Sequence, residues 1–111
     1  MRIVKLKLGS SDLISTIDFL INDLKFDYEN HSTDMSVLTW EEYYFRKIQF
    51  NMIIVKREQS HILIDIIGGA GGTGILKIAW WSERRYTNRV RKVLKKYAHE
   101  FNFSLEEIES L

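Results

Sequence analysis

The chain has 111 residues, of which 45% are hydrophobic and 28% are charged. This length suffices for one soluble domain with its own hydrophobic core, but not for two. The absence of cysteine excludes disulfides, thiol chemistry and cysteine-ligated metal, and we expect a cytoplasmic location. No apolar run approaches the roughly 20 residues that span a bilayer, and the N-terminus lacks the pattern of a signal peptide.

Charge is distributed unevenly, although the net charge is only +1. Residues 12–42 contain eight acidic residues and one base, whereas residues 84–96 contain seven bases and no acid. Such an asymmetry indicates either a basic binding surface or two parts of one molecule that attract each other.

The first 25 residues predict a strand followed by a helix. Arg2–Leu8 alternates in polarity, as a half-buried strand does, and Gly9 interrupts the pattern. Ser10 or Ser11 is a suitable N-cap for a helix that extends to about Lys25. The apolar stripe of this helix consists of Leu13, Ile17, Leu20, Ile21 and Leu24, and Phe19 lies outside it.

Three further strands are predicted before residue 58. Phe26–His31 is a short polar strand, followed by a turn at residues 32–34. Met35–Arg46 offers a candidate capping box and a helical stripe, but its β-branched and aromatic residues favour a strand over a helix. Phe50–Arg57 is predicted as the next strand.

Residues 62–81 predict a glycine-centred β-hairpin in the core sheet. Two apolar runs flank the loop Gly68–Gly74, which contains five glycines. With the loop centred on Gly71, one face of the hairpin is wholly apolar and the other carries an opposite-charge pair. The predicted pairs are Ile62 with Trp80, Ile64 with Ile78 and Ile66 with Leu76 on the apolar face, and His61 with Trp81, Leu63 with Ala79, Asp65 with Lys77 and Ile67 with Ile75 on the other.

The same glycines match the dinucleotide-binding pattern GxGxxG at Gly69, Gly71 and Gly74. That pattern binds pyrophosphate only where a helix follows the loop, and the alternation after Gly74 indicates a strand. About 20 residues further on, where an acidic residue should bind the ribose, the chain is rich in arginine. We therefore favour a structural glycine turn over a phosphate site.

A long helix is predicted after Trp81, with Ser82 as its N-cap. Its apolar arc consists of Tyr86, Val90, Val93, Leu94, Tyr97 and Phe101, and bases fill much of the remaining surface. We expect the arc to pack on the sheet and the basic side to face solvent. Residues 104–111 are predicted to be a loose tail, either one helical turn or disordered, so that the domain comprises residues 1–103.

The predicted order is strand, helix, five strands, helix, an α+β fold. Consecutive strands with short connections imply an antiparallel meander. The sheet is expected to pack against the long C-terminal helix in a helix-grip-like arrangement.

Three features resemble a family of short, uncharacterised bacterial proteins. The first is an aromatic-E-x-Y-Y-x-R segment, here Trp40, Glu41, Tyr43, Tyr44 and Arg46. The others are the glycine-rich loop and a tryptophan before the last helix, here Trp80 or Trp81. The similarity covers residues 40–97, and the strongly basic last helix departs from the family pattern. The resemblance implies the fold class and no mechanism.

Catalytic and metal sites are not predicted. His31, His61 and His99 lie on different predicted elements without metal-ligand spacing, and we expect no metal or cofactor. Glu41 and Tyr43 share one face of their predicted strand, while Arg46 lies on the other, so a solvated strand is favoured over an acid–base site. An enzyme is therefore the last choice among the functional classes.

The favoured function is a non-enzymatic domain that binds an apolar or amphipathic small molecule between the sheet and the last helix. The expected ligand contacts are Trp80, Tyr86, Tyr97, Glu41 and Tyr43.

The first alternative is a nucleic-acid or anionic-surface binder. Its expected contacts are the cations Arg84, Arg85, Arg89, Arg91, Lys92, Lys95 and Lys96. A solvated basic face, or one docked on an acidic surface, is favoured over that role. The second alternative is a self-associating structural protein that forms a homo-oligomer.

Overall fold

The computed structural model describes residues 2–10, 12–44, 47–70 and 76–110, and within them it leaves out the side chains of residues 2, 43–44, 47–49, 69–70, 76–86 and 110. The elements in chain order are β1 (Arg2–Leu8), α1 (Leu13–Asp23), β2 (Tyr28–His31), β3 (Met35–Tyr44), β4 (Lys47–Arg57), β5 (Ile62–Ala70), α2 (Leu76–Phe101) and β6 (Leu105–Ser110).

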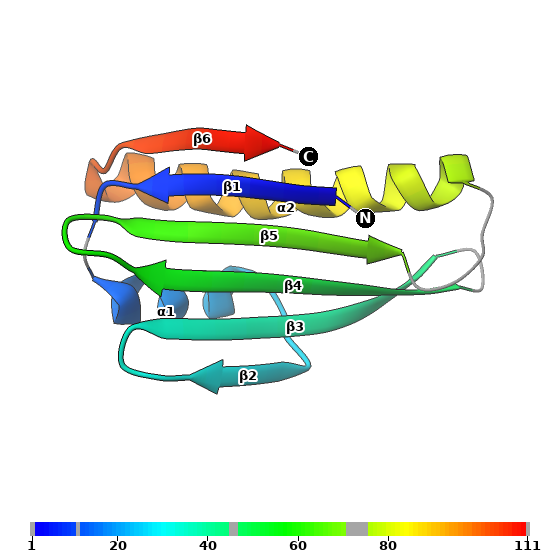
Figure 1. Cartoon of the computed structure of the whole chain (residues 1–111), viewed down its shortest axis with the longest axis horizontal. Coiled ribbons are helices and arrows are strands. Elements are labelled where there is room, and N and C mark those ends of the chain that lie inside the picture. Colours follow the sequence, from blue (N-terminus) through cyan, green and yellow to red (C-terminus); the bar gives the residue numbers. More distant parts are fainter. Residues whose placement is uncertain (1, 11, 45–46, 71–75, 111) are drawn as a thin grey trace.

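The six strands form one antiparallel sheet in the order β2-β3-β4-β5-β1-β6. Both helices lie behind the sheet in Figure 1, α2 along β5, β1 and β6, and α1 behind β4. The predicted α+β class, with an antiparallel sheet packed against a long helix, is confirmed. Within that class, the observed order of elements differs from the predicted order at two places, after the glycine loop and after the last helix.

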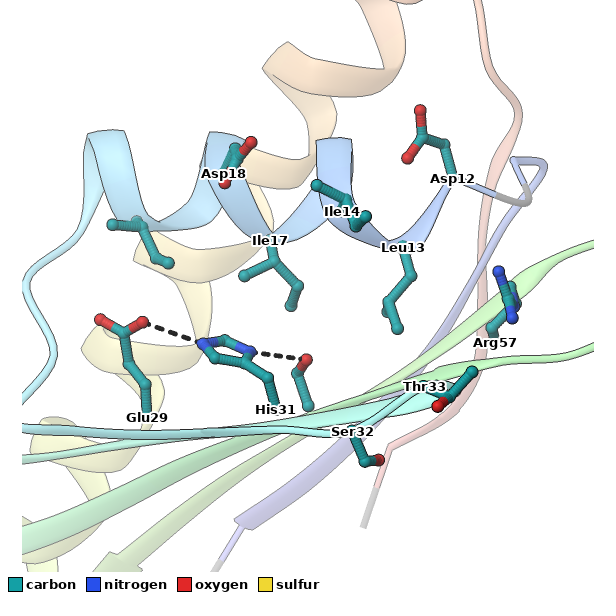
Figure 2. Close-up of a pocket in the computed structure, with 12 residues that line it drawn as sticks. Asp12, Leu13, Ile14, Ile17, Asp18, Glu29, His31, Ser32, Thr33 and Arg57 are labelled. Carbon is teal, nitrogen blue, oxygen red and sulfur yellow. Dashed lines mark hydrogen bonds and ion pairs between the residues drawn. The ribbon is translucent and has the colours of Figure 1, made fainter.

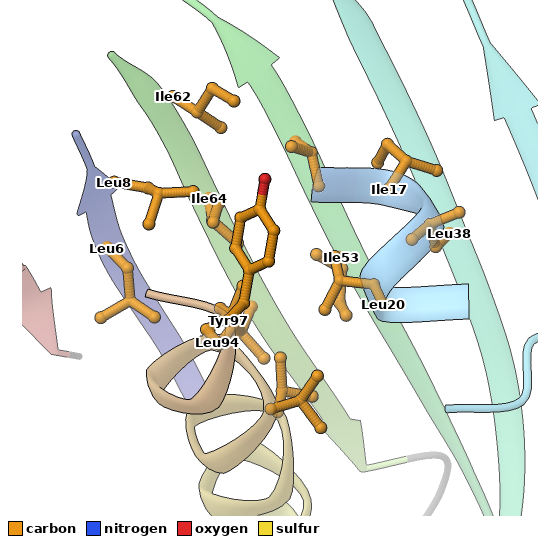
Figure 3. Packing of buried hydrophobic residues seen from close by; sticks show 14 of the residues in the cluster. Leu6, Leu8, Ile17, Leu20, Leu38, Ile53, Ile62, Ile64, Leu94 and Tyr97 are labelled. Carbon is orange, nitrogen blue, oxygen red and sulfur yellow. The ribbon is translucent and has the colours of Figure 1, made fainter. Parts of the chain in front are cut away.

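The core lies between the sheet and the helices because the strands alternate in polarity. Val4, Leu6 and Leu8 of β1 are at most 3% exposed. They pair in register with equally buried residues of β5, as Leu6 does with Ile64. Figure 3 shows the side chains of Leu6, Leu8 and Ile64 directed from the strands toward Leu94 and Tyr97 of α2. Side chains at the intervening positions, such as Lys5, point to the opposite face of the sheet.

The predicted glycine hairpin is wrong, because the chain after the loop continues as a helix. α2 begins at Leu76, so Ile78 and Trp80 lie on the helix, and Ser82 is inside the helix instead of capping it. β5 pairs with β4 and β1: Ile64 faces Val55 and Leu6. In place of Lys77, Asp65 has Lys5 as its cross-strand partner, with 4.0 Å between Nζ and Oδ1. Gly71 and residues 72–75 lie outside the described residues.

The failure has a physical cause. Ile75–Trp81 alternates like a strand, but its apolar residues are so dense that the segment also continues the helical pattern of residues 86–101. The preferred partner of β5 comes from β1, about 60 residues away, which local pattern cannot reveal.

α1 starts one or two residues later than the serine caps predict. The N-cap is Asp12, whose carboxylate accepts a hydrogen bond from the Ser15 amide at 3.0 Å. Ser10 instead accepts a hydrogen bond from the Asp12 amide at 3.2 Å. The predicted apolar stripe is buried at Leu13, Ile17, Leu20 and Leu24, while Ile21 is partly exposed.

The predicted loose tail is a strand over most of its length. β6 lies antiparallel to β1, and Glu106 and Glu109 face Lys7 and Lys5 across the pair. The chain reverses after α2 through Asn102, whose φ of 59° is in the left-handed region that asparagine tolerates. β1 offers an unpaired edge and two lysines, so an acidic segment that is unremarkable alone gains backbone hydrogen bonds and opposite-charge neighbours.

Tyr97 joins the two helices. It is 1% exposed, and its hydroxyl donates a hydrogen bond to Ser15 Oγ at 2.9 Å and accepts a longer one from Thr16 Oγ1. Its ring lies 4.8 Å from that of Phe19 and 5.1 Å from that of Phe101, measured between centroids. Phe19, which lies outside the predicted stripe, therefore contacts α2.

We expect Tyr97→Phe to lower the free energy of unfolding by about 1 kcal/mol, because the ring packing stays and the hydroxyl hydrogen bonds between α1 and α2 are lost. Urea unfolding monitored by circular dichroism measures this. Tyr28→Phe, at a tyrosine that is 58% exposed, is the control and should leave the stability unchanged. Equal effects of the two substitutions would contradict the assigned role of the Tyr97 hydroxyl.

Gly9 meets Ser104 where the end of β1 approaches the start of β6. A Cβ atom at Gly9 would lie 2.3 Å from Ser104 Oγ, and the Gly9 amide donates to the Ser104 carbonyl at 2.8 Å. We expect Gly9→Ala to cost about 1 kcal/mol from the overlap. In a Ser104→Ala background the same substitution should be neutral or slightly stabilising, because alanine restricts the unfolded chain. Thermal unfolding of the four proteins in this cycle tests the coupling; a Gly9→Ala cost that persists without the Ser104 hydroxyl would refute it.

Candidate ligand-binding groove

A groove of about 860 Å³ opens between α1 and the β2–β3 end of the sheet. Figure 2 shows α1 as one wall, with Leu13 and Ile17 directed toward the strands, and β2 as the other, with Glu29 and His31 directed toward the helix. The lining residues are Asp12, Leu13, Ile14, Ile17, Asp18, Ile21, Glu29, His31, Ser32, Thr33, Ser36 and Arg57.

The helix wall is apolar because the apolar residues of α1 extend beyond the stripe that is buried against the sheet. Leu13 and Ile17 are buried against the core, and Ile21 is partly exposed. Ile14, one position beyond the buried stripe, is 75% exposed at the mouth of the groove. Since isoleucine gains nothing from water contact, this exposed side chain offers apolar surface to a bound molecule.

The strand wall is polar and is organised by His31. Its Nδ1 lies 2.8 Å from Ser36 Oγ, and its Nε2 lies 3.0 Å from Glu29 Oε1. Ser36 is the cross-strand neighbour of His31, and Glu29 precedes it by two residues on the same face of β2. Contacts on both ring nitrogens fix the orientation of the imidazole.

This chain of hydroxyl, imidazole and carboxylate has the composition of a hydrolase triad, but not its accessibility. Ser36 is only 2% exposed, whereas a nucleophile must reach its substrate. Its hydroxyl also faces Nδ1, the nitrogen that the acid occupies in the serine protease arrangement. The three groups are better explained as a mutually satisfied polar wall.

Charge in the groove is predominantly negative. Asp12 and Asp18 lie along its outer rim on α1 (Figure 2), and Glu29 lies inside it. Arg57 closes one end and is paired with Asp34, with 2.6 Å between Nη2 and Oδ1. Because this arginine is already neutralised, the lining favours a positively charged group over an anion.

Of the five residues predicted to contact a ligand, the structure describes the side chains of Tyr97 and Glu41, and these two do not line a common cavity among those described. Tyr97 is packed in the core, and Glu41 is exposed on β3. The side chains of Tyr43, Trp80 and Tyr86 lie outside the described residues. Two smaller cavities, of about 320 and 370 Å³, lie beside α2. Glu41 borders the second, next to Trp40 and Arg89.

Three basic residues of α2 pair with acids of the same molecule. Arg89 pairs with Glu42 of β3, and Arg91 pairs with Glu107 of β6. Lys96 lies 3.3 Å from Asp23 of α1, and its Nζ is 5.7 Å from the centroid of the Phe19 ring.

Lys92 and Lys95 are exposed, and the side chains of Arg84 and Arg85 are outside the described residues. Of the two interpretations of the charge asymmetry, attraction between residues 12–42 and the basic helix accounts for two of the three described pairs, those of Arg89 and Lys96.

Residues 2–10, 12–44, 47–70 and 76–110 contain no group of three or more histidine and acidic side chains able to hold a metal ion. Neither described helix has the length and apolarity that a bilayer crossing demands.

Sequence reasoning missed the groove, although the signals for its parts are present. The polar strand and the turn at residues 32–34 place His31 opposite Ser36 whenever β2 and β3 pair. What the sequence does not reveal is that α1 crosses this end of the sheet, which depends on contacts with α2.

Comparison with known proteins gives a family and no function. Searches of curated proteins and of solved structures returned no match. The sequence profile described as "Family of unknown function (DUF6054)" matches residues 15–98, which includes the segment on which the resemblance to uncharacterised proteins rests. The chain belongs to this family of unknown function.

Proposed function

We propose that this protein is a non-enzymatic binding domain that holds a small amphipathic cation in the groove between α1 and β2–β3. We favour this groove over the pocket expected between the sheet and the last helix, because Tyr97, one of the residues expected to line that pocket, is 1% exposed. The observation that carries the proposal is a cavity of about 860 Å³ whose lining combines the apolar side chains of α1 with three acidic residues, Asp12, Asp18 and Glu29.

The size of the groove supports a small-molecule ligand. Its volume of about 860 Å³ lies within the roughly 300–1,000 Å³ typical of ligand sites. An apolar portion would lie along Ile14, Ile17 and Ile21, where it would remove exposed isoleucine surface from water. Each methylene that becomes buried contributes about 0.8 kcal/mol.

The polar wall supports the choice of a cation. A positive group near Glu29 would interact with this carboxylate and with the more distant Asp12 and Asp18. The contact of Glu29 with His31 leaves its second oxygen for a ligand, because a carboxylate accepts several hydrogen bonds. An anionic group would meet the same carboxylates as repulsive charges.

Two surfactants with the same alkyl chain and opposite head groups test the proposal, each below its critical micelle concentration. We expect dodecyltrimethylammonium to titrate one site in calorimetry and dodecyl sulfate to fail to saturate that site. Glu29→Gln should weaken ammonium binding about fivefold, the effect of about 1 kcal/mol from one partly solvated charge. Ile14→Ser should also weaken ammonium binding, because it removes part of the apolar wall that the alkyl chain would contact.

Matched controls lie elsewhere on the molecule. Glu100→Gln removes one exposed acid near the end of α2, and Ile108→Ser removes an isoleucine on β6 that is 52% exposed. Neither should alter ammonium binding. Equal binding of the two head groups, or control variants as impaired as the groove variants, would sink the proposal.

A further inference from the structure

The face of the sheet opposite the helices is mainly apolar on β3, β4 and β5, and it is uncovered in the described part of the chain. Figure 1 shows both helices on the far side and no element in front of the strands. The apolar side chains that occupy this face include Val37, Phe50, Met52, Ile54, Leu63 and Ile67. Most are half-buried by their neighbours on the same face, and Phe50 is 45% exposed.

Strand register makes these side chains one continuous surface. Ile54 of β4 faces Val37 of β3, and Met52 faces both Thr39 of β3 and Ile67 of β5. Side chains at paired and alternate positions lie within about 5–8 Å of one another, so those of β3 and β4 are neighbours on one surface. A contiguous apolar face of this kind indicates a protein partner.

Opposite charges lie at opposite ends of the β3–β4 half of this face. Glu41 of β3 pairs with Phe50 at one end, and Lys56 of β4 pairs with Met35 at the other. The two ends are about 20 Å apart along the strands. Both charged residues are exposed, whereas Lys5 and Asp65 near the middle of the sheet pair with each other.

We propose that a second copy of this chain packs on this face, sheet against sheet, to form a symmetric dimer with four layers in the order helix, sheet, sheet, helix. A two-fold axis that lies between the two sheets and runs perpendicular to the strands places the Glu41 end of one copy over the Lys56 end of the other. This brings Glu41 and Lys56 of different copies together twice, with the apolar residues between them. An axis parallel to the strands would not bring these two residues together.

The charge pattern favours a second copy over a nucleic acid or an anionic membrane. The described charges on this face include both signs in similar number, so the face has no cationic excess to attract phosphates. In an isologous interface both copies use the same surface, and the two-fold axis turns one copy end for end relative to the other. A face that is negative at one end and positive at the other is therefore complementary to a second copy of itself.

The available area is sufficient for a reversible dimer. Five strands spaced about 4.8 Å apart and seven residues long give a flat area of about 550 Å². The accessible area of a corrugated side-chain surface is larger, which approaches the roughly 800 Å² per partner of a standard interface. Packed sheets lie about 10 Å apart with strands near −30°, which the twist of this sheet permits. The ligand groove lies on the helix side, so the dimer leaves it open in both copies.

Sedimentation velocity over a wide range of protein concentrations tests the dimer. We expect a reversible monomer–dimer equilibrium for the unaltered chain. Glu41→Lys or Lys56→Glu alone should raise the dimer dissociation constant at least about tenfold, because each creates two like-charge contacts at the interface. The double variant Glu41→Lys/Lys56→Glu should recover an affinity close to that of the unaltered chain.

Glu100→Lys and Lys92→Glu are the matched controls, because they make the same changes of net charge at exposed positions on α2. They should leave the dissociation constant unchanged. Circular dichroism establishes that each variant is folded, and the restored double variant separates lost affinity from misfolding. A chain that is monomeric at every concentration would overturn the proposal. So would a dimer whose dissociation constant is unchanged by the single charge reversals.

Discussion

The insertion of β1 between β5 and β6 is the constraint on which the rest of the structure depends. β1 is an interior strand, and Val4, Leu6 and Leu8 supply the middle of the surface on which α2 packs. Without β1 the buried isoleucines of β5 would lie on an edge strand beside water. The position of α2 follows from this pairing, and the position of α1 follows from α2 through the aromatic contact of Phe19 with Tyr97. The groove exists because α1, held in this way, overhangs the polar edge strand β2.

Charge reinforces the arrangement that burial sets. The acidic first third of the chain and the basic last helix come together where Asp23 meets Lys96 and Glu42 meets Arg89. Pairs this exposed each contribute little to stability, typically under about 1 kcal/mol. Their larger effect is on specificity, because both pairs form only where Arg89 lies beside β3 and Lys96 beside α1. The basic helix thereby becomes part of the fold, which weakens the case for a nucleic-acid surface at those cations.

Prediction from the sequence succeeded where the determining contacts are local. Alternation identified β1, and the density of β-branched and aromatic residues favoured the strand over the helix at β3. Helical spacing identified the buried stripes of α1 and of residues 90–97. Prediction failed where the partner strand is distant in the sequence. Ile75–Trp81 fits both the periodicity of a strand and that of a helix, and only the competition of β1 for the edge of β5 decides between the two. β6 was missed for the same reason, since its acidic sequence becomes a strand only beside Lys5 and Lys7.

The groove was beyond sequence reasoning for a related reason. His31 and Ser36 were assigned to strands correctly, but their shared environment depends on which helix crosses above them. Tyr97 illustrates the converse error: an aromatic residue on a predicted apolar arc can serve as a ligand contact or as core, and only its burial distinguishes the two.

The placement of β1 also has a consequence for biosynthesis. β1 is synthesised before both of its neighbours in the sheet, β5 and β6. Until both neighbours have left the ribosome, the buried face of β1 lacks its partners within the sheet. The sheet therefore closes only after β6 has been synthesised.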